Sequence, residues 1–185
     1  MRITNTSSLL EDQLRDIYDF EKRLVRAIPK MAKAATSEEL RSGLTEHLEV
    51  TKNHVLRIEQ AFELLDLPAK AKSCDGIKGI ISEGEETIGE DMEDSLKDAA
   101  ITCAARRVEH YEMAAYAGAH AMAQHLGNRK VADLLQQNWD EEREADEKLG
   151  ELTVKMLKAS DSGAEGEPAE TERRTSSPKS RTAER

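Results

Sequence analysis

The chain has 185 residues, of which 35% are charged, and its formal net charge at pH 7 is −10. Prolines number 4 and aromatic residues make up 3%, which favours an all-helical domain over a strand-rich one. The negative charge disfavours binding to nucleic acid and to anionic membranes. No stretch approaches the roughly 20 apolar residues of a membrane span, and Met1–Leu10 lacks the apolar core of a signal peptide. A cytoplasmic protein is therefore expected.

The first third of the chain predicts two neighbouring helices. A Ser-x-x-Glu capping box beginning at Ser8 opens a helix expected over Ser8–Ala35. A Thr-x-x-Glu box beginning at Thr36 opens a second helix, expected over Ser37–Leu65. Only a tight turn separates the two helices, so they are expected to form an antiparallel hairpin.

The next segment, Asp66–Asp94, differs in composition. Leu67-Pro68 breaks the preceding helix, and scattered glycines leave room only for a short helix around Ile77–Ile88. Connections inside helical bundles are usually short. This long segment therefore predicts a crossover that travels the length of the bundle, which makes the next long helix parallel to the second.

A second hairpin is predicted after the crossover. One helix is expected over Ser95–Leu126 and another over Arg129–Lys158, separated by the turn residues Gly127-Asn128. Residues 1–158 are thus predicted to form an all-α four-helix bundle, in which two antiparallel hairpins are joined by a long crossover containing a short helix.

The last segment, Ala159–Arg185, contains no Val, Leu, Ile, Met or aromatic residue, and it is predicted to be a disordered tail. Its basic stretch Arg173–Arg181 suits an anionic partner. Acidic residues just before that stretch weaken this interpretation, so a solvated tail is the simpler expectation.

Carboxylates interrupt the apolar stripes of three of the long helices. Glu21 is the only charged residue on the first stripe, and Glu112 lies in the middle of the third with Glu109 at its border. Glu142 interrupts the fourth stripe, with Asp146 one turn further along the edge. A buried carboxylate is costly unless something neutralises it, so these positions indicate a shared function.

The interrupted positions share one height in the predicted bundle. Glu21 and Thr51 each lie 15 residues from Thr36 in the first turn. Glu112 and Glu142 each lie 15 residues from Gly127 in the second turn. At about 1.5 Å per residue this distance is near the middle of helices about 42 to 48 Å long. The predicted central cluster is Glu21, Glu112 and Glu142, flanked by Glu109, Asp146 and His54.

Two chemical interpretations of this cluster stay open. No Lys or Arg lies on the inward stripes, so one or two divalent metal ions are the natural counter-charge. Oxygen-rich ligands with few imidazoles suit Fe or Mn, and Mg or Ca would suit a degenerate site. Alternatively, the carboxyl groups bond to Tyr, Thr and Asn side chains in a polar core, where His54 is only a hydrogen-bonded residue. His47 also faces inward but is predicted to lie about a turn further from Glu142.

Three short runs resemble the YciE/YciF family of bacterial stress-associated ferritin-like proteins. They are Arg-Val-Glu-His-Tyr-Glu at 107–112, Ala-Ile-Pro-Lys-Met-Ala at 27–32 and His-Leu-Glu at 47–49. The resemblance covers about residues 5–158. It implies a ferritin-like fold, a role in stress response and a homodimer, for which the alanines at 114, 117 and 121 offer a face that permits close helix contact.

The ferritin-like superfamily takes one Glu from each of two helices and a Glu-x-x-His from each of the other two. The resemblance assigns Glu21 to the first helix and Glu112 or Glu109 to the third, where Glu-His-Tyr-Glu is similar to the Glu-Asn-Tyr-Glu pattern of rubrerythrins. The other helices depart from the motif. They read Thr51-x-x-His54 and Glu142-x-x-Ala145, with Asp146 as a substitute one residue later.

These departures argue against a full di-iron oxidase or ferroxidase. The expected function is a metal-binding stress protein and, if it is an enzyme, a weak di-metal oxidoreductase of the rubrerythrin type with a small-molecule substrate that is unknown. The alternative is a non-catalytic dimeric scaffold with a polar core and a tail that binds a protein partner. An iron-storage cage is a third hypothesis, without a sequence feature that identifies a large shell.

Overall fold

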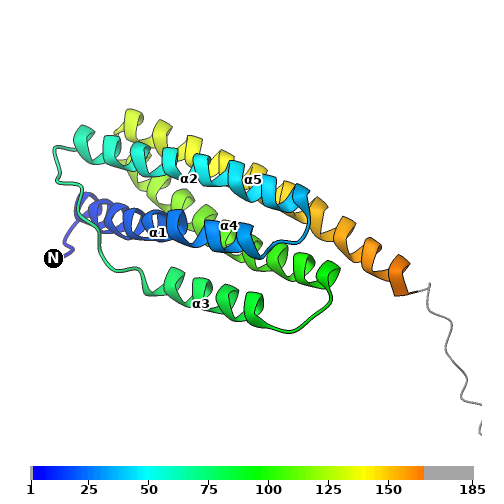
Figure 1. Cartoon of the computed structure of the whole chain (residues 1–185). Coiled ribbons are helices and arrows are strands. Elements are labelled where there is room, and N and C mark those ends of the chain that lie inside the picture. The colour runs from blue at the N-terminus through cyan, green and yellow to red at the C-terminus, as the bar shows by residue number, and fades with distance from the viewer. Residues whose placement is uncertain (1, 165–185) are drawn as a thin grey trace, which may run out of the picture.

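The computed structural model describes residues 2–164, and over these residues it consists of helices and connecting segments without a strand (Figure 1). The prediction of an all-α bundle is confirmed. The helices are α1 (Thr6–Ala34), α2 (Glu38–Leu64), α3 (Asp75–Gly89), α4 (Asp94–His125) and α5 (Arg129–Ala164).

The long helices α1, α2, α4 and α5 form the bundle, in which α1 packs against α2 and α4, and α5 packs against α4 and α2. Asp98, near the start of α4, accepts hydrogen bonds from the backbone N–H groups of Thr36 and Ser37 in the α1–α2 turn. Because α4 starts at this end, it runs antiparallel to α1 and parallel to α2, as the long crossover predicted (Figure 1). The short helix α3 lies outside the bundle against α4 and α1.

The core is mainly apolar, with a polar layer at mid-height and the buried polar residues Asp98 and Thr102 near the start of α4. Leu14, Ile58 and Leu135 are among the fully buried aliphatic side chains. Each such side chain contributes about 1.5 to 3 kcal/mol by leaving water. At mid-height the fully buried residues are instead Glu21 and Glu142, among others. The apolar layers hold the helices in register around this polar centre.

Both predicted capping boxes are wrong. Asn5 caps α1 by accepting a hydrogen bond from the backbone N–H of Ser8, so Ser8 lies inside the helix. Ser37 caps α2, because the hydroxyl of Thr36 donates to Asp98 instead. In the second case the cause is a tertiary contact, because the acceptor that takes the Thr36 hydroxyl lies on α4.

The last helix is longer than expected. α5 continues past the predicted end at Lys158 as far as Ala164, so the first residues of the predicted tail are helical. The rest of the predicted disordered tail, residues 165–185, lies outside the described residues.

A helix with the length and low polarity needed to cross a membrane is absent from residues 2–164.

Candidate metal centre

Each long helix contributes one side chain to a fully buried cluster at the middle of the bundle. Glu21 comes from α1, His54 from α2, Glu112 from α4 and Glu142 from α5, and none is more than 1% exposed. Each offers one ligand atom, and these atoms all lie within 4.8 Å of one another. The structure therefore brings together four of the six predicted ligands. We call these four residues the inner group.

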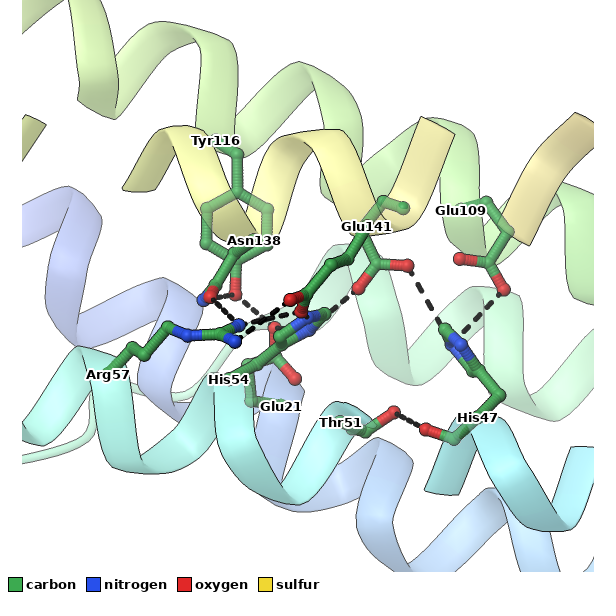
Figure 2. Close-up of polar contacts among 10 residues, drawn as sticks. Glu21, His47, Thr51, His54, Arg57, Glu109, Tyr116, Asn138 and Glu141 are labelled. Atoms are coloured by element: carbon green, nitrogen blue, oxygen red, sulfur yellow. Dashed lines mark hydrogen bonds and ion pairs between the residues drawn. The ribbon is translucent and has the colours of Figure 1, made fainter. Parts of the chain in front are cut away.

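A second set of ligand atoms adjoins the first. His47, Glu109 and Glu142 also lie within 4.8 Å of one another, and we call them the outer group. His47 Nε2 is 3.5 Å from Glu109 Oε1 and 3.7 Å from Glu142 Oε2. Figure 2 shows His47 and Glu109 together at the end of the constellation remote from Arg57. Because Glu142 belongs to both groups, its two oxygens can bridge two neighbouring ions.

The His54 ring is held by carboxylates at both nitrogens. Its Nδ1 lies 2.7 Å from Glu142 Oε1, and its Nε2 lies 2.8 Å from Glu141 Oε2. Arg57 in turn binds both oxygens of Glu141 at 2.6 and 2.8 Å (Figure 2). A carboxylate that accepts a hydrogen bond from Nε2 directs Nδ1 toward the cluster, as in carboxylate–histidine–metal arrangements.

Arg57 also supports Glu21 through a second chain of hydrogen bonds. Arg57 Nη1 donates to Asn138 Oδ1 at 2.9 Å, and Asn138 Nδ2 donates to the Tyr116 hydroxyl at 2.9 Å. The Tyr116 hydroxyl donates to Glu21 Oε1 (Figure 2). One guanidinium thus orients two members of the inner group, His54 and Glu21, through intermediates on α5 and α4.

Burial and crowding alter the proton affinities of the cluster. Burial, followed by the charge of Glu142, raises the pKa values of Glu109 and Glu112 well above the usual range. Burial opposes the charged form of His54, but the charge of Glu21 and hydrogen bonds to Glu141 and Glu142 raise its pKa to about 11. Protons on these groups partly offset the negative charge that the described helices concentrate here.

The pKa of Glu142 moves the other way. Burial raises it, but hydrogen bonds with Glu109 and His54 outweigh burial and lower the pKa below its ordinary value. The pKa of Glu142 is thus shifted opposite to those of Glu109 and Glu112, which favours the charged form of the carboxylate that the two groups share.

The chemistry of the unpaired atoms fits a metal. Within residues 2–164, six buried polar atoms of these groups lack a hydrogen bond of good geometry. Two of them, His54 Nδ1 and Glu142 Oε1, face each other at 2.7 Å, and the others cost free energy unless a cation or water satisfies them. Carboxylate oxygens with one imidazole per group are a donor set suited to Fe or Mn. The atoms are Glu21 Oε2, His54 Nδ1, Glu109 Oε2, Glu112 Oε1 and both side-chain oxygens of Glu142.

Asp146 lies outside both groups. Its carboxylate binds Arg106 through Nε at 2.7 Å and Nη2 at 3.1 Å, and His110 Nε2 is 3.3 Å away. Thr51, predicted at the same height, is buried, but its hydroxyl donates to the backbone carbonyl of His47. Neither side chain supplies an atom to the inner or the outer group.

Two residues that the sequence analysis did not identify support the centre: Arg57, which reaches Asn138, and Glu141, with which Arg57 pairs. The sequence signals for Arg57 and Glu141 are weak: Arg57 follows His54 by one turn, and Glu141 precedes Glu142. Both lie beside the inward stripes, and long side chains reach a centre from such positions with their aliphatic stems packed. The pattern of apolar stripes alone therefore does not predict these two residues.

Comparison with known proteins connects this centre to a family. A protein family described as a domain of unknown function (DUF892) matches residues 5–160. Protein YciF of Escherichia coli (strain K12) is 39% identical over 142 residues, which are 76% of this chain and 86% of that protein. The resemblance noted from short sequence runs is thereby confirmed.

Solved structures give the same result. The crystal structure of the E. coli stress protein YciF superposes with a TM-score of 0.82 and 35% identity, covering 84% of this chain and 99% of that one. YcfI from Rhodopseudomonas palustris superposes with a TM-score of 0.78 and 40% identity, covering 80% of this chain and 94% of that one. A Xanthomonas campestris protein, 20% identical over 87% of this chain and 99% of its own, shares the fold with a TM-score of 0.69.

Proposed function

The chain belongs to the DUF892 family as a relative of the stress protein YciF, and we propose that it binds one or two Fe or Mn ions at the centre of its bundle. The observation that carries this proposal is the convergence of buried ligand atoms from four helices, six of which, on five side chains, lack a hydrogen bond of good geometry. Glu21, His54, Glu112 and Glu142 would hold the inner ion. His47, Glu109 and the second oxygen of Glu142 would hold the outer ion.

Charge balance supports two divalent ions. The two groups contain four carboxylates, Glu21, Glu109, Glu112 and Glu142, and two neutral-capable imidazoles. Two divalent cations would neutralise four ionised carboxylates, and this removes the need for protons on Glu109 and Glu112. Binding of the ions should therefore release protons.

A bound Fe or Mn ion would supply one-electron redox chemistry and Lewis acidity. The chain's own residues bind the ions, exclude bulk water and fix the His54 ring through Glu141. If the protein is an enzyme, oxidoreductase chemistry of the rubrerythrin type belongs at this centre.

Elemental analysis of the full chain tests metal binding. After loading with Fe(II) or Mn(II) and removal of free metal, we expect between one and two ions per chain, which fall by at least half in Glu112→Gln. Glu147→Gln, on the exposed side of α5, is the matched control and should retain the wild-type content. Metal content near zero in the wild type, or equal in Glu112→Gln, would overturn the proposal.

A non-catalytic scaffold is the second candidate, and the hydrogen bonds from Tyr116 to Glu21 and from Asn138 to Tyr116 favour it, because they satisfy part of the polar core without a metal. Protonated carboxyl groups can share hydrogen bonds in a polar core without a metal. In this case Glu112→Gln leaves binding of a protein partner intact, and deletion of residues 159–185 abolishes it. The metal-centre proposal expects the reverse: Glu112→Gln should lower the metal content, and the deletion should leave it unchanged.

We also propose that the chain forms a homodimer. The support is that Ala114 and Ala121 on α4 are exposed, which leaves this part of α4 free for close contact with a second helix. Size-exclusion chromatography with light scattering should give twice the chain mass. A monomer, or a species of many chains such as a storage cage, would contradict the proposal.

A further inference from the structure

A pocket of about 200 Å³ opens between α2 and α5 beside the outer group. Its walls are mainly aliphatic, and its inner end reaches His47 and Glu109. The aliphatic lining consists of Leu40, Leu44, Val50, Ala145, Leu149 and Leu152. An engineered cavity of about 150 Å³ is enough to hold benzene, so this pocket suits a molecule of similar or slightly larger size.

The inner end of the pocket is polar and is formed by Glu109 and His47. Glu109 is only 3% exposed, and its Oε2 has no hydrogen-bond partner among the described residues. His47, whose side chain is 16% exposed, lies 3.5 Å from the other oxygen of Glu109. A ligand in the pocket would thus have an aliphatic wall along its length and a polar group, or an ion held by that group, at its end.

Charge considerations select an uncharged ligand. Among the described residues that line the pocket, Lys148 is the only cation, and it pairs with Glu144 at 2.8 Å. In the metal-free protein, an anion would therefore meet Glu46 without a free counter-charge. A cation would lose its hydration against aliphatic walls, and an outer metal ion would repel it.

We propose that this pocket binds an uncharged, mainly aliphatic molecule with one oxygen-bearing end, and that this end points toward His47 and Glu109. The proposal rests on the proposed function in one respect, namely that the oxygen atom meets the outer metal ion when that ion is bound. The aliphatic contacts with Leu44 and Leu149 exist independently of the metal. The pocket would therefore place a small organic substrate beside the outer group without disturbing the inner group.

Gly43 provides a way to close the pocket without touching a ligand residue. It lies on α2 in the pocket lining, and a Cβ added there would meet no atom within 4 Å. Glycine inside a helix is also less favourable than alanine by about 0.5 to 1 kcal/mol, so Gly43→Leu should fold well. Gly79 on α3 is equally free of neighbours and remote from the pocket, which makes Gly79→Leu the matched control.

The experiment uses the full chain loaded with Mn(II) and 1-hexanol as the probe. Paramagnetic relaxation by Mn(II) depends steeply on distance, so the protons beside the hydroxyl group should relax faster than those of the terminal methyl group. Gly43→Leu should weaken 1-hexanol binding by about tenfold at unchanged Mn(II) content, and Gly79→Leu should leave it unchanged. In the metal-free protein, hexanoate and hexylammonium should bind more weakly than 1-hexanol.

Saturation transfer from protein methyl groups to 1-hexanol, measured in the presence of a chelator, separates failure of the pocket from failure of the metal centre. Transfer that Gly43→Leu abolishes supports the pocket even if Mn(II) does not bind, in which case only the proposed metal function fails. Transfer equal in wild type and Gly43→Leu overturns the pocket, whatever the metal content. Preference of the metal-free protein for either charged probe, or fastest relaxation at the methyl end in the Mn(II) protein, also overturns the inference.

Discussion

The inner and outer groups share Glu142 but differ in almost every other respect. The inner group draws one residue from each of the four long helices and is almost entirely buried. The outer group draws on α2, α4 and α5 only, and its His47 lines a pocket that opens between two helices. Residues on all four helices must keep their places to maintain the inner group, whereas the outer group lies where a small molecule can reach it.

The hydrogen bonds that support the two groups also differ. Arg57 reaches His54 through Glu141, and Glu21 through Asn138 and Tyr116. Glu109 instead contacts His47 and Glu142, which are themselves members of the outer group. One centre can thus combine two halves. The preorganised half is suited to tight metal binding, and the accessible half is suited to ligand exchange and reaction.

Removal of the shared carboxylate should have the largest effect. Glu142→Ala deletes a ligand from both groups, so both ions should be lost and the metal content should fall to near zero by elemental analysis. Circular dichroism at the same time should show a folded helical protein. Retention of one full ion would show that the two groups do not depend on a common bridge.

Single substitutions on α4 should separate the two halves. Glu109→Gln should remove the outer ion and keep the inner one, whereas Glu112→Gln should remove the inner ion, and the outer ion should then bind more weakly. Stepwise titration with Mn(II), monitored by electron paramagnetic resonance, distinguishes one bound ion from two. Identical titrations for the two variants would contradict the division into groups.

Loss of Arg57 should weaken metal binding without changing the number of ions bound. Arg57→Gln removes the bonds that orient Glu141 and Asn138, and loss of such supporting partners typically costs about 10- to 100-fold in metal affinity. Isothermal titration should show this loss for the tighter ion only. Arg143→Gln is the matched control, because Arg143 pairs with Asp140 on the exposed surface of α5. An equal loss in both variants would point to a general charge effect.

The smallest effect is expected at Asp146. Asp146→Asn breaks the ion pair with Arg106, which is partly exposed and is expected to contribute about 1 kcal/mol or less to stability. Metal content should stay at the wild-type value, because Asp146 lies outside both groups. A large loss of metal in this variant would return Asp146 to the ligand set that the sequence suggested.

The sequence was most informative where helix geometry alone determines position. Glu21, Glu112 and Glu142 share one height because each lies 15 residues from a turn and every α-helix rises by the same amount per residue. Their common inward direction follows from the apolar stripes that they interrupt. The central cluster and the bundle topology could therefore be predicted from one chain.

Side chains at the edge of a stripe were less predictable. Asp146 and Arg57 both lie within a turn of an inward residue, yet Asp146 turns to Arg106 on α4, and Arg57 turns to Glu141 on α5. Their directions depend on which partner a neighbouring helix presents, and helical periodicity does not contain that information. The cap at Ser37 was missed for the same reason, because Asp98 on α4 takes the hydroxyl of Thr36.

Anomalous diffraction from crystals loaded with Mn(II) would show directly whether Glu142 lies between two metal ions. We expect two anomalous peaks, one on each side of the Glu142 carboxylate. One should lie among Glu21, His54 and Glu112, and the other between His47 and Glu109. An absence of anomalous density at Glu142 in fully loaded crystals, or metal bound only at the surface, would contradict the account.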